Sequence, residues 1–540
     1  MGWPSGRSAG RAVWLTLPGM RTKLRLALAL ALLPAGLLVS SASAAEQNVV
    51  RTDAGLVRGT TSGEARVFNG IPYAAPPVGA LRWKAPQPVK PWDGVRAAVE
   101  LGNPCPQQSN PEVPDGATNE DCLYLNVTTP ATSSAKPRAV LVWIPGGGFF
   151  SGAGNSYEAS QLAARGDVVV VTVNYRLGIF GFFGYPGLPG SGTYGIQDQQ
   201  AALRWVQRNA RAFGGDPSNV TVAGESAGGM SVCAQLTSPT AAGLFANAIM
   251  QSGSCAFNWD DNSQYPGQVA DSPWVPVNTV QTTGKEWAAD NKDKLACQPA
   301  QPILECLRSV KPDVLAQDTL QFTQVAYGGS AVVPLSPAKA MKAGLFHHVP
   351  VISGNNHDEA APWLAAFGEI TDYPRLVTDM VGKEQAAKVL REYPLDRYDS
   401  AAAAWTAVTT DRIWSCTQAA TDQQAARKVP VYAYEFADKQ SPLAQPGQGA
   451  VHAAELPYLF KLGGYDWPLS ETQQRLSNQM IDYWTAFART GDPNGPDRPH
   501  WAPTNAHTVT GLSLAPTDQT GIQPVNLTAE HHCKFWAGIS

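Results

Sequence analysis

The segment Gly224-Glu-Ser-Ala-Gly228 places a serine between two glycines, directly after the short apolar run Val220–Ala223. A serine hydroxyl is a poor nucleophile unless a base lies beside it and the neighbouring chain leaves it uncrowded. Flanking glycines permit a sharp turn from a strand into a helix, which lifts the serine above the edge of a sheet. The pattern therefore predicts Ser226 as a nucleophile for acyl transfer.

The GxSxG motif alone is a weak signal, because Gly6-Arg-Ser-Ala-Gly10 matches it as well. No strand precedes that first copy, whereas Ser226 follows an apolar run and precedes the helix-compatible segment Ala227–Leu236. The alternative interpretation of the second copy is a glycine-rich turn without chemistry. The partner residues elsewhere in the chain argue against this alternative.

A second glycine-rich turn, Pro145-Gly-Gly-Gly-Phe149, ends the predicted strand Ala139–Ile144. Successive glycines let the backbone approach a bound carbonyl group and direct its N–H groups at the oxygen. Gly147 and Gly148, together with the N–H of Ala227, are predicted to form an oxyanion hole. A phosphate-binding loop is disfavoured because the lysine and Ser/Thr of the Walker spacing are missing.

A general base must reach the serine, and histidine is the usual choice. His452 lies in the glycine-lined segment Gly447–Pro457, after the predicted strand Val431–Phe436. Loops at the carboxyl ends of parallel strands form the sites of such folds. His500 and His507 lie in a Pro/Asn-rich segment and are interpreted as surface residues. Further histidines near the C-terminus are His531 and His532.

The carboxylate that orients the base is expected between the serine and the histidine in chain order. The predicted strand Val349–Ser353 leads into Asp358 and Glu359. Position alone does not choose between these adjacent carboxylates.

Short apolar runs alternate with helical patterns such as Gln197–Asn209. This alternation predicts an α/β fold, a mostly parallel central sheet covered by helices on both faces. Residues 256–330 and 360–430 are less regular and are interpreted as insertions or a cap. The 540 residues would by length alone favour several domains. No linker marks a boundary, so one large catalytic domain over residues 45–540 is predicted.

The N-terminus has the composition of a secretory signal. Arg21, Lys23 and Arg25 precede the apolar run Leu26–Val39, and small residues follow up to Ala44. Residues 1–44 are predicted to be removed after export, and Met20 would start a signal of ordinary length. A transmembrane anchor is disfavoured because the run is shorter than the roughly 20 residues that a span needs. The mature protein is expected to be secreted, without stable insertion into a membrane.

The overall composition excludes several partners. The formal net charge is −4 without long runs of one sign, so no nucleic-acid partner is expected. Eight cysteines in an exported protein favour disulfides, although spacing alone leaves their pairing open. No Cys/His spacing of a metal site is present, and neither a metal nor a cofactor is expected.

Several motifs together resemble the type-B carboxylesterase family of α/β hydrolases, which includes cholinesterases and fungal lipases. The resemblance covers about residues 47–540. It rests on Gly70-Ile-Pro-Tyr-Ala-Ala-Pro-Pro-Val-Gly-Ala-Leu-Arg82, Glu120-Asp-Cys-Leu-Tyr-Leu-Asn126, Gly146-Gly-Gly-Phe149, Asn174-Tyr-Arg-Leu177, Phe213-Gly-Gly-Asp-Pro217, Gly224-Glu-Ser-Ala-Gly-Gly229, Asp358-Glu359 and His452. Pro145, where the family has an aromatic residue or histidine, and Ala360, where it has glycine, depart from the pattern.

The resemblance implies that Glu359 is the acid of the triad and His452 its base. It implies the same oxyanion donors, and it assigns Glu225 and Phe149 to the substrate pocket. It also implies the disulfides Cys105–Cys122, Cys297–Cys306 and Cys416–Cys533. Cys233 and Cys255 are left over and are suggested to pair.

The predicted function is hydrolysis of carboxylic esters through an acyl-serine intermediate, with activity falling below a pH of about 6.5 as an unperturbed histidine becomes charged. A lipase is one alternative, but only 16 polar, Pro-rich residues separate Cys105 from Cys122, where fungal relatives carry a lid. That loop also lacks a tryptophan that would hold a quaternary ammonium. A catalytically silent binding protein is the other alternative. Soluble short-chain or bulky esters are the expected substrates, and the natural ester is left open.

Overall fold

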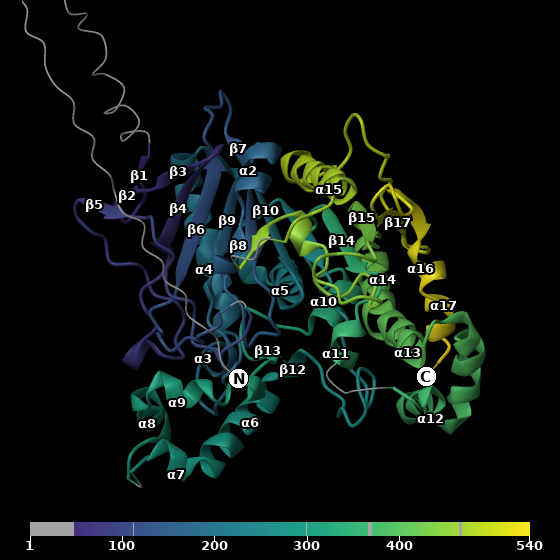
Figure 1. Cartoon of the computed structure of the whole chain (residues 1–540). Coiled ribbons are helices and arrows are strands. Elements are labelled where there is room, and N and C mark those ends of the chain that lie inside the picture. Colours follow the sequence, from purple (N-terminus) through teal and green to yellow (C-terminus); the bar gives the residue numbers. More distant parts are fainter. Residues whose placement is uncertain (1–47, 112, 299, 366–369, 464–466, 540) are drawn as a thin grey trace, which may run out of the picture. The chain divides into compact units, whose positions relative to one another are not determined.

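Short β-branched and aliphatic runs form an eleven-stranded mixed sheet in the described part of the chain (Figure 1). The computed structural model describes residues 48–539 except 112, 299, 366–369 and 464–466, so the predicted leader lies outside the described residues. Seven strands are parallel: β9 (Val169–Val173), β7 (Arg138–Ile144), β10 (Gly215–Glu225), β11 (Asn247–Gln251), β14 (Val351–Asn356), β15 (Val431–Phe436) and β17 (Thr510–Leu514).

Antiparallel strands extend this sheet at both edges. They are β6 (Tyr124–Pro130), β4 (Ala65–Pro72) and β3 (Thr60–Ser62) beside β9, and β18 (Gln523–Asn526) beside β17. A separate small sheet contains β1 (Val49–Arg51), β2 (Leu56–Arg58) and β5 (Val95–Ala97). The predicted parallel sheet is thus confirmed, with antiparallel edges added.

Strand β7 shows how the sequence specifies two buried faces. Val140, Val142 and Ile144 join the hydrophobic cluster on one side of the sheet, whereas Leu141 and Trp143 join the cluster on the other side. Successive side chains of a strand point to opposite faces, so a continuous apolar run requires cover on both.

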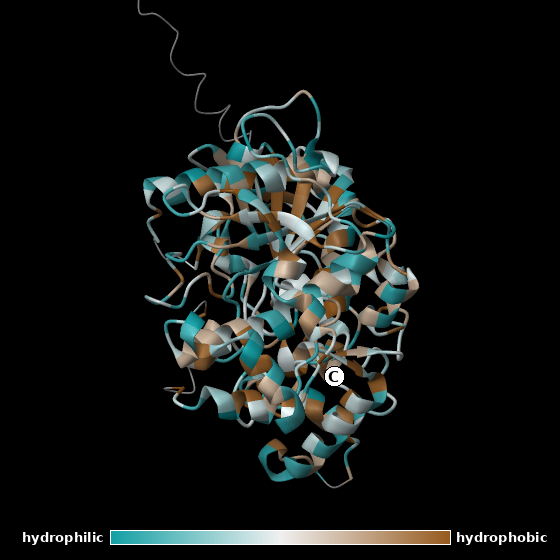
Figure 2. Cartoon of the chain, turned by 90° about the vertical axis from the view of Figure 1, so that its right-hand side faces the viewer, coloured by the Kyte–Doolittle hydropathy of each residue, from teal (hydrophilic) through white to brown (hydrophobic). Residues whose placement is uncertain are grey.

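Helices supply that cover on both faces. One face packs against α4 (Tyr194–Asn209), α5 (Ala227–Leu236), α10 (Pro337–Ala343) and α14 (Cys416–Ala425). The other packs against α2 (Ser160–Gly166) and α15 (Glu471–Thr490). Figure 2 shows hydrophobic strands enclosed by helices whose residues alternate between hydrophobic and hydrophilic. None of the described helices is long and apolar enough to cross a membrane.

Both segments that look irregular in the sequence contain several helices, and residues 360–430 are mostly helical. Residues 256–330 contain α6 (Val277–Asp290), α7 (Lys292–Leu295), α8 (Ile303–Ser309) and α9 (Pro312–Ala316), with the strand pair β12 (Trp274–Pro276) and β13 (Val325–Tyr327). Residues 360–430 contain α11 (Ala361–Ala365), α12 (Tyr373–Glu392), α13 (Ala401–Thr409) and α14. Gly382, with φ of 75°, interrupts α12 and hides its helical period in the sequence.

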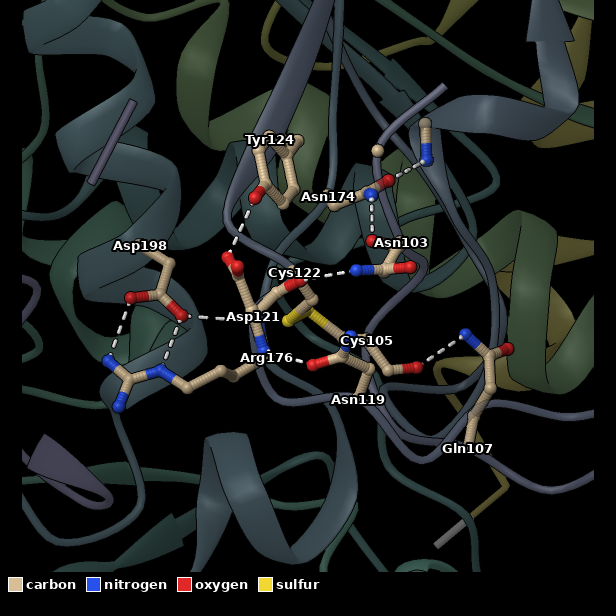
Figure 3. The surroundings of a disulfide bond; sticks show 12 residues. Asn103, Cys105, Gln107, Asn119, Asp121, Cys122, Tyr124, Asn174, Arg176 and Asp198 are labelled. Atoms are coloured by element: carbon tan, nitrogen blue, oxygen red, sulfur yellow. Dashed lines mark hydrogen bonds and ion pairs between the residues drawn. A yellow bond between two sulfur atoms is a disulfide. The ribbon is translucent and has the colours of Figure 1, made fainter. Parts of the chain in front are cut away.

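Two buried ion pairs anchor the family motifs. Arg176 donates to both carboxylate oxygens of Asp198 at 2.7 Å, close to the Cys105–Cys122 disulfide (Figure 3). Arg82 forms a bidentate pair with Glu120 and also donates to two carbonyl groups at the end of α8. Bidentate arginine–carboxylate pairs are the directional form of this interaction. These motif residues therefore fix loops to the sheet.

All eight cysteines are paired within the described chain. The bonds are Cys105–Cys122, Cys233–Cys255, Cys297–Cys306 and Cys416–Cys533.

A buried charge cluster holds the C-terminal segment to the sheet. His531 contacts Asp411 at 2.6 Å through Nδ1 and Glu435, on β15, at 2.9 Å through Nε2. Burial opposes the imidazolium, but the two carboxylates outweigh it and raise the pKa of His531 well above its ordinary value. Burial likewise opposes the Glu435 carboxylate, yet His531 lowers the pKa of Glu435. His531 is thus a structural cation.

His531→Gln should lower the free energy of unfolding by about 3–5 kcal/mol, because two buried carboxylates lose their cation. A raised pKa in the folded state means that this stabilisation is fully present below about pH 6.5 and is lost as the pH rises through the raised value. Urea unfolding at pH 6 and 9 measures both effects. His532→Gln, which removes a half-exposed pair with Glu392, is the matched control and should cost about 1 kcal/mol or less. Equal losses in the two variants would contradict the prediction.

Candidate active site

Ser226 lies at the turn between β10 and α5. Its φ of 56° is unfavourable for a residue with a side chain, and such strain persists only where the surroundings fix it. The Ser226 N–H donates to the carbonyl of Gln251, at the end of the adjacent strand β11, at 2.9 Å. A Cβ atom on Gly228 would come within 2.0 Å of the Ile144 carbonyl oxygen, so only glycine permits this turn. The predicted nucleophile therefore lies at the carboxyl ends of the parallel strands.

The glycine turn after β7 lies against this serine. A Cβ atom on Gly146 would be 3.2 Å from Ser226 Cβ and 2.8 Å from the Glu225 carboxylate. Gly147 and Gly148 have positive φ values of 100° and 60°. No group in the described chain accepts a hydrogen bond from the backbone N–H of Gly147, Gly148 or Ala227. Three N–H donors are thus available around Ser226.

Glu359 is fully buried beyond β14 and faces His452. Its Oε2 atom lies 2.6 Å from His452 Nδ1. Its Oε1 atom accepts from Ser252 Oγ at 2.5 Å, from the Asn356 N–H at 2.9 Å and from Asn355 Nδ2 at 3.3 Å. The carboxylate is therefore held from both sides, as orientation of an imidazole requires.

The neighbouring Asp358 faces the loop that carries the histidine. It accepts from the Ala450 N–H at 2.9 Å and donates its own N–H to the Ala450 carbonyl at 2.9 Å. Because adjacent residues project differently, Glu359 contacts the imidazole of His452 and Asp358 holds the backbone beside it.

His452 lies between two carboxylates and two indole rings. Nε2 is 3.1 Å from Glu225 Oε1, and the rings of Trp363 and Trp414 have centroids 4.9 and 4.7 Å away. Burial lowers the pKa of His452, but Glu225 and Glu359 outweigh it and raise the pKa to about 9. Across the described residues, no hydrogen bond joins Ser226 to His452. Such contacts are often long without substrate and tighten in the reacting complex.

Sequence reasoning missed several side chains that surround this site. The Ser252 hydroxyl and the Asn356 backbone N–H donate to Glu359. Glu455 accepts from Asn356 Nδ2 at 2.7 Å and from Gln251 Nε2 at 2.8 Å. Burial, opposed by these donors, raises the pKa of Glu455. A signal was present, because polar residues follow the apolar run of β11 and therefore lie at the edge that carries Ser226.

In the described chain, no hydrogen bond, ion pair or ring contact joins Phe149 or the other histidines considered in the sequence to Ser226 or His452. Phe149 is buried against Phe182, with ring centroids 5.0 Å apart. His500 and His507 are exposed, and the other C-terminal histidines belong to the charge clusters described above. In the described ranges, no group of three His, Cys, Asp or Glu side chains is arranged to hold a metal ion.

A serine at a strand–helix turn above a parallel sheet, with a histidine and a buried carboxylate on later loops, defines the class of the α/β hydrolases. The family model named Carboxylesterase family matches residues 46–536, and the chain belongs to this family. The family resemblance is thereby confirmed, and the protein is a carboxylic ester hydrolase.

Relatives of known activity cover most of the chain. The para-nitrobenzyl esterase of Bacillus subtilis (strain 168) is 36% identical over 464 residues, which are 83% of this chain and 90% of the relative. The cocaine esterase of Homo sapiens is 33% identical over 479 residues, 82% of each chain. A solved PNB esterase structure superimposes with a TM-score of 0.74 at 32% identity, covering 91% of this chain and 99% of that one.

Proposed function

We propose that Ser226, Glu359 and His452 form the catalytic triad of this ester hydrolase. The observation that carries the proposal is the buried Glu359 carboxylate on His452 Nδ1 at 2.6 Å, because it leaves Nε2 as the nitrogen for proton transfer. Gly147, Gly148 and Ala227 supply the oxyanion hole. Glu225 and Phe149 are the proposed pocket residues, and Phe149 is buried against Phe182 directly after the glycine turn.

The chemistry follows in two steps of the same kind. Ser226 Oγ attacks the ester carbonyl while His452 Nε2 takes its proton, and the three N–H groups stabilise the oxyanion. The imidazolium then protonates the leaving alcohol, and an acyl-serine ester remains. Water attacks this ester with His452 again as base, which releases the acid and restores the serine. Glu359 orients the imidazole and stabilises its charged form throughout.

Ser226→Ala should remove turnover and all covalent labelling by a fluorophosphonate, because the Ser226 hydroxyl is the nucleophile of the proposed site. Hydrolysis of a p-nitrophenyl ester and gel detection of the label measure this result. Ser231→Ala, on the same helix, is the control and should keep both. Labelled or active Ser226→Ala protein would refute the triad.

The pH dependence of kcat/KM should reflect the raised pKa of His452. The base must be neutral, so activity falls as the pH drops below about 9, higher than the 6.5 of an unperturbed imidazole. Glu225→Gln removes one of the three carboxylates that raise this pKa and should move the acid limb down by about 1–2 pH units. Glu286→Gln, an exposed change, should leave the limb in place. The same limb in all three proteins would contradict the proposed base and its partner.

Soluble short-chain or bulky esters are the proposed substrates. The Cys105–Cys122 loop is small and held at Gln107, whose side chain donates to the Cys105 carbonyl at 3.0 Å (Figure 3). The same side chain donates to the Gly152 carbonyl at 3.1 Å and accepts from the Gly152 N–H at 2.9 Å. Gln107 and Ala117 pair across the loop. Such a loop offers little apolar surface to a lipid interface, which supports an esterase over a lipase.

Rates with a short-chain acylglycerol should therefore rise smoothly with concentration and saturate below its solubility limit. A titration through that limit measures this. A sharp increase in rate at the limit would favour the lipase instead.

We also propose that residues 1–44 direct export and that residues 45–540 form one catalytic domain. The four disulfides support export, because such bonds persist in oxidising compartments. N-terminal sequencing of protein from the culture medium should find a chain that begins near residue 45. A secreted chain that retains residues 21–39 would contradict the proposal.

A further inference from the structure

The Cys233–Cys255 disulfide connects the helix that follows Ser226 to the loop that follows β11. Cys233 lies on α5, two turns beyond Ser226, and Cys255 lies shortly after Ser252. Both cysteines are fully buried. The bond therefore lies between two segments that each contact the proposed triad.

The same two segments touch through their backbones. A Cβ atom on Gly253 would come within 2.4 Å of Gly229 Cα, and a Cβ atom on Gly229 would come within 2.6 Å of the Gln251 carbonyl oxygen. No side chain separates the first turn of α5 from the loop. A displacement of the loop is therefore transmitted directly to the residues beside Ser226.

Two consecutive residues at the end of β11 contact the proposed triad: Gln251 binds the proposed nucleophile and Ser252 binds the proposed acid. The Gln251 carbonyl accepts from the Ser226 N–H at 2.9 Å. Ser252 donates from Oγ to Glu359 at 2.5 Å and from its N–H to the Gly354 carbonyl at 2.8 Å. Ser252 has φ of 49°, an unfavourable conformation that its surroundings must maintain.

We propose that the Cys233–Cys255 disulfide is a positioning element, which fixes the Ser226 turn and the Glu359 carboxylate relative to each other through Ser252. The inference rests on the proposed triad. A misplacement of about 1 Å at a catalytic group can cost roughly 100-fold in rate, so loss of this bond should reduce the chemical step. Substrate binding involves other contacts and should change little.

The Cys297–Cys306 disulfide lies apart from the proposed triad. Cys297–Cys306 closes a short segment between α7 and α8, within the helical insertion. Cys297 is partly exposed, and the bond contacts none of the proposed triad residues in the structure. Its removal provides a matched control, in which stability changes without a change in the positions of Ser226 and Glu359.

The test compares Cys233→Ala/Cys255→Ala with Cys297→Ala/Cys306→Ala. The active-site concentration of each is titrated with a fluorophosphonate, so that kcat refers to folded, labelled protein only. The first variant should lose roughly tenfold or more in kcat with KM within about twofold, and the control should keep both. A kcat per labelled site within twofold of the unaltered protein would overturn the proposal. Labelling itself reports on Ser226, so failure of the triad would be seen separately.

Gly253→Ala keeps the test decisive where the disulfide-free variant does not fold, and Ser252→Ala extends the test where that variant does fold. Gly253→Ala retains both cysteines but forces the loop away from Gly229, and it should lower kcat in the same way. Ser252→Ala removes the donor to Glu359, and disulfide removal in that background should cost little more. Unchanged kcat in Gly253→Ala, or fully additive effects of Ser252→Ala and disulfide removal, would refute positioning through Ser252.

Discussion

The chain must reverse direction between β10 and α5 at a single residue, and the rest of the site depends on this constraint. The Ile144 carbonyl lies where a side chain on Gly228 would be, and the backbone of Ser226 is held at φ of 56°. Such a turn is stable only if neighbouring strands fix it on both sides. Strand β7 does so with its terminal carbonyl and glycine turn, and β11 does so through Gln251. The same geometry brings the backbone N–H groups of Gly147, Gly148 and Ala227 close to Ser226.

The carboxylates around His452 are the second feature on which the site depends. Three carboxylates, Glu225, Glu359 and Glu455, act on the imidazole of His452 and overcome the effect of its burial. An environment of this kind stabilises the imidazolium, the form that the proposed mechanism requires as Ser226 loses its proton. The same environment keeps the base protonated at neutral pH. The arrangement therefore favours the imidazolium over the neutral imidazole in the free protein as well as in the proposed reaction.

Buried ion pairs outside the site serve a different purpose. Arg176–Asp198 and Arg82–Glu120 hold the loops between strands, and His531 holds the C-terminal segment between Asp411 and Glu435. Directional contacts pair their charges and specify one arrangement of the chain rather than adding much net stability. A site built from loops of distant segments requires such fixed points.

The sequence by itself determined the elements whose geometry is local. Apolar β-branched runs specified β7, β10 and β15, and glycines at fixed offsets marked the turns that carry Ser226 and the proposed oxyanion donors. The helical nature of residues 360–430 was not predictable, since Gly382 breaks the period of α12 and its apolar contacts come from distant segments.

Only the tertiary structure decided what depends on contacts between distant segments. It shows Glu359 rather than Asp358 against the His452 imidazole, a choice that position along the chain left open and that only the family resemblance implied. The direction of adjacent side chains follows from the backbone path after β14. The tertiary structure also joined Cys233 to Cys255 and brought Ser252, Asn356, Glu455 and Trp414 to the site. The raised pKa of His452 belongs to this group as well. Electrostatic shifts depend on distances between residues far apart in the chain, and spacing along a sequence does not contain those distances.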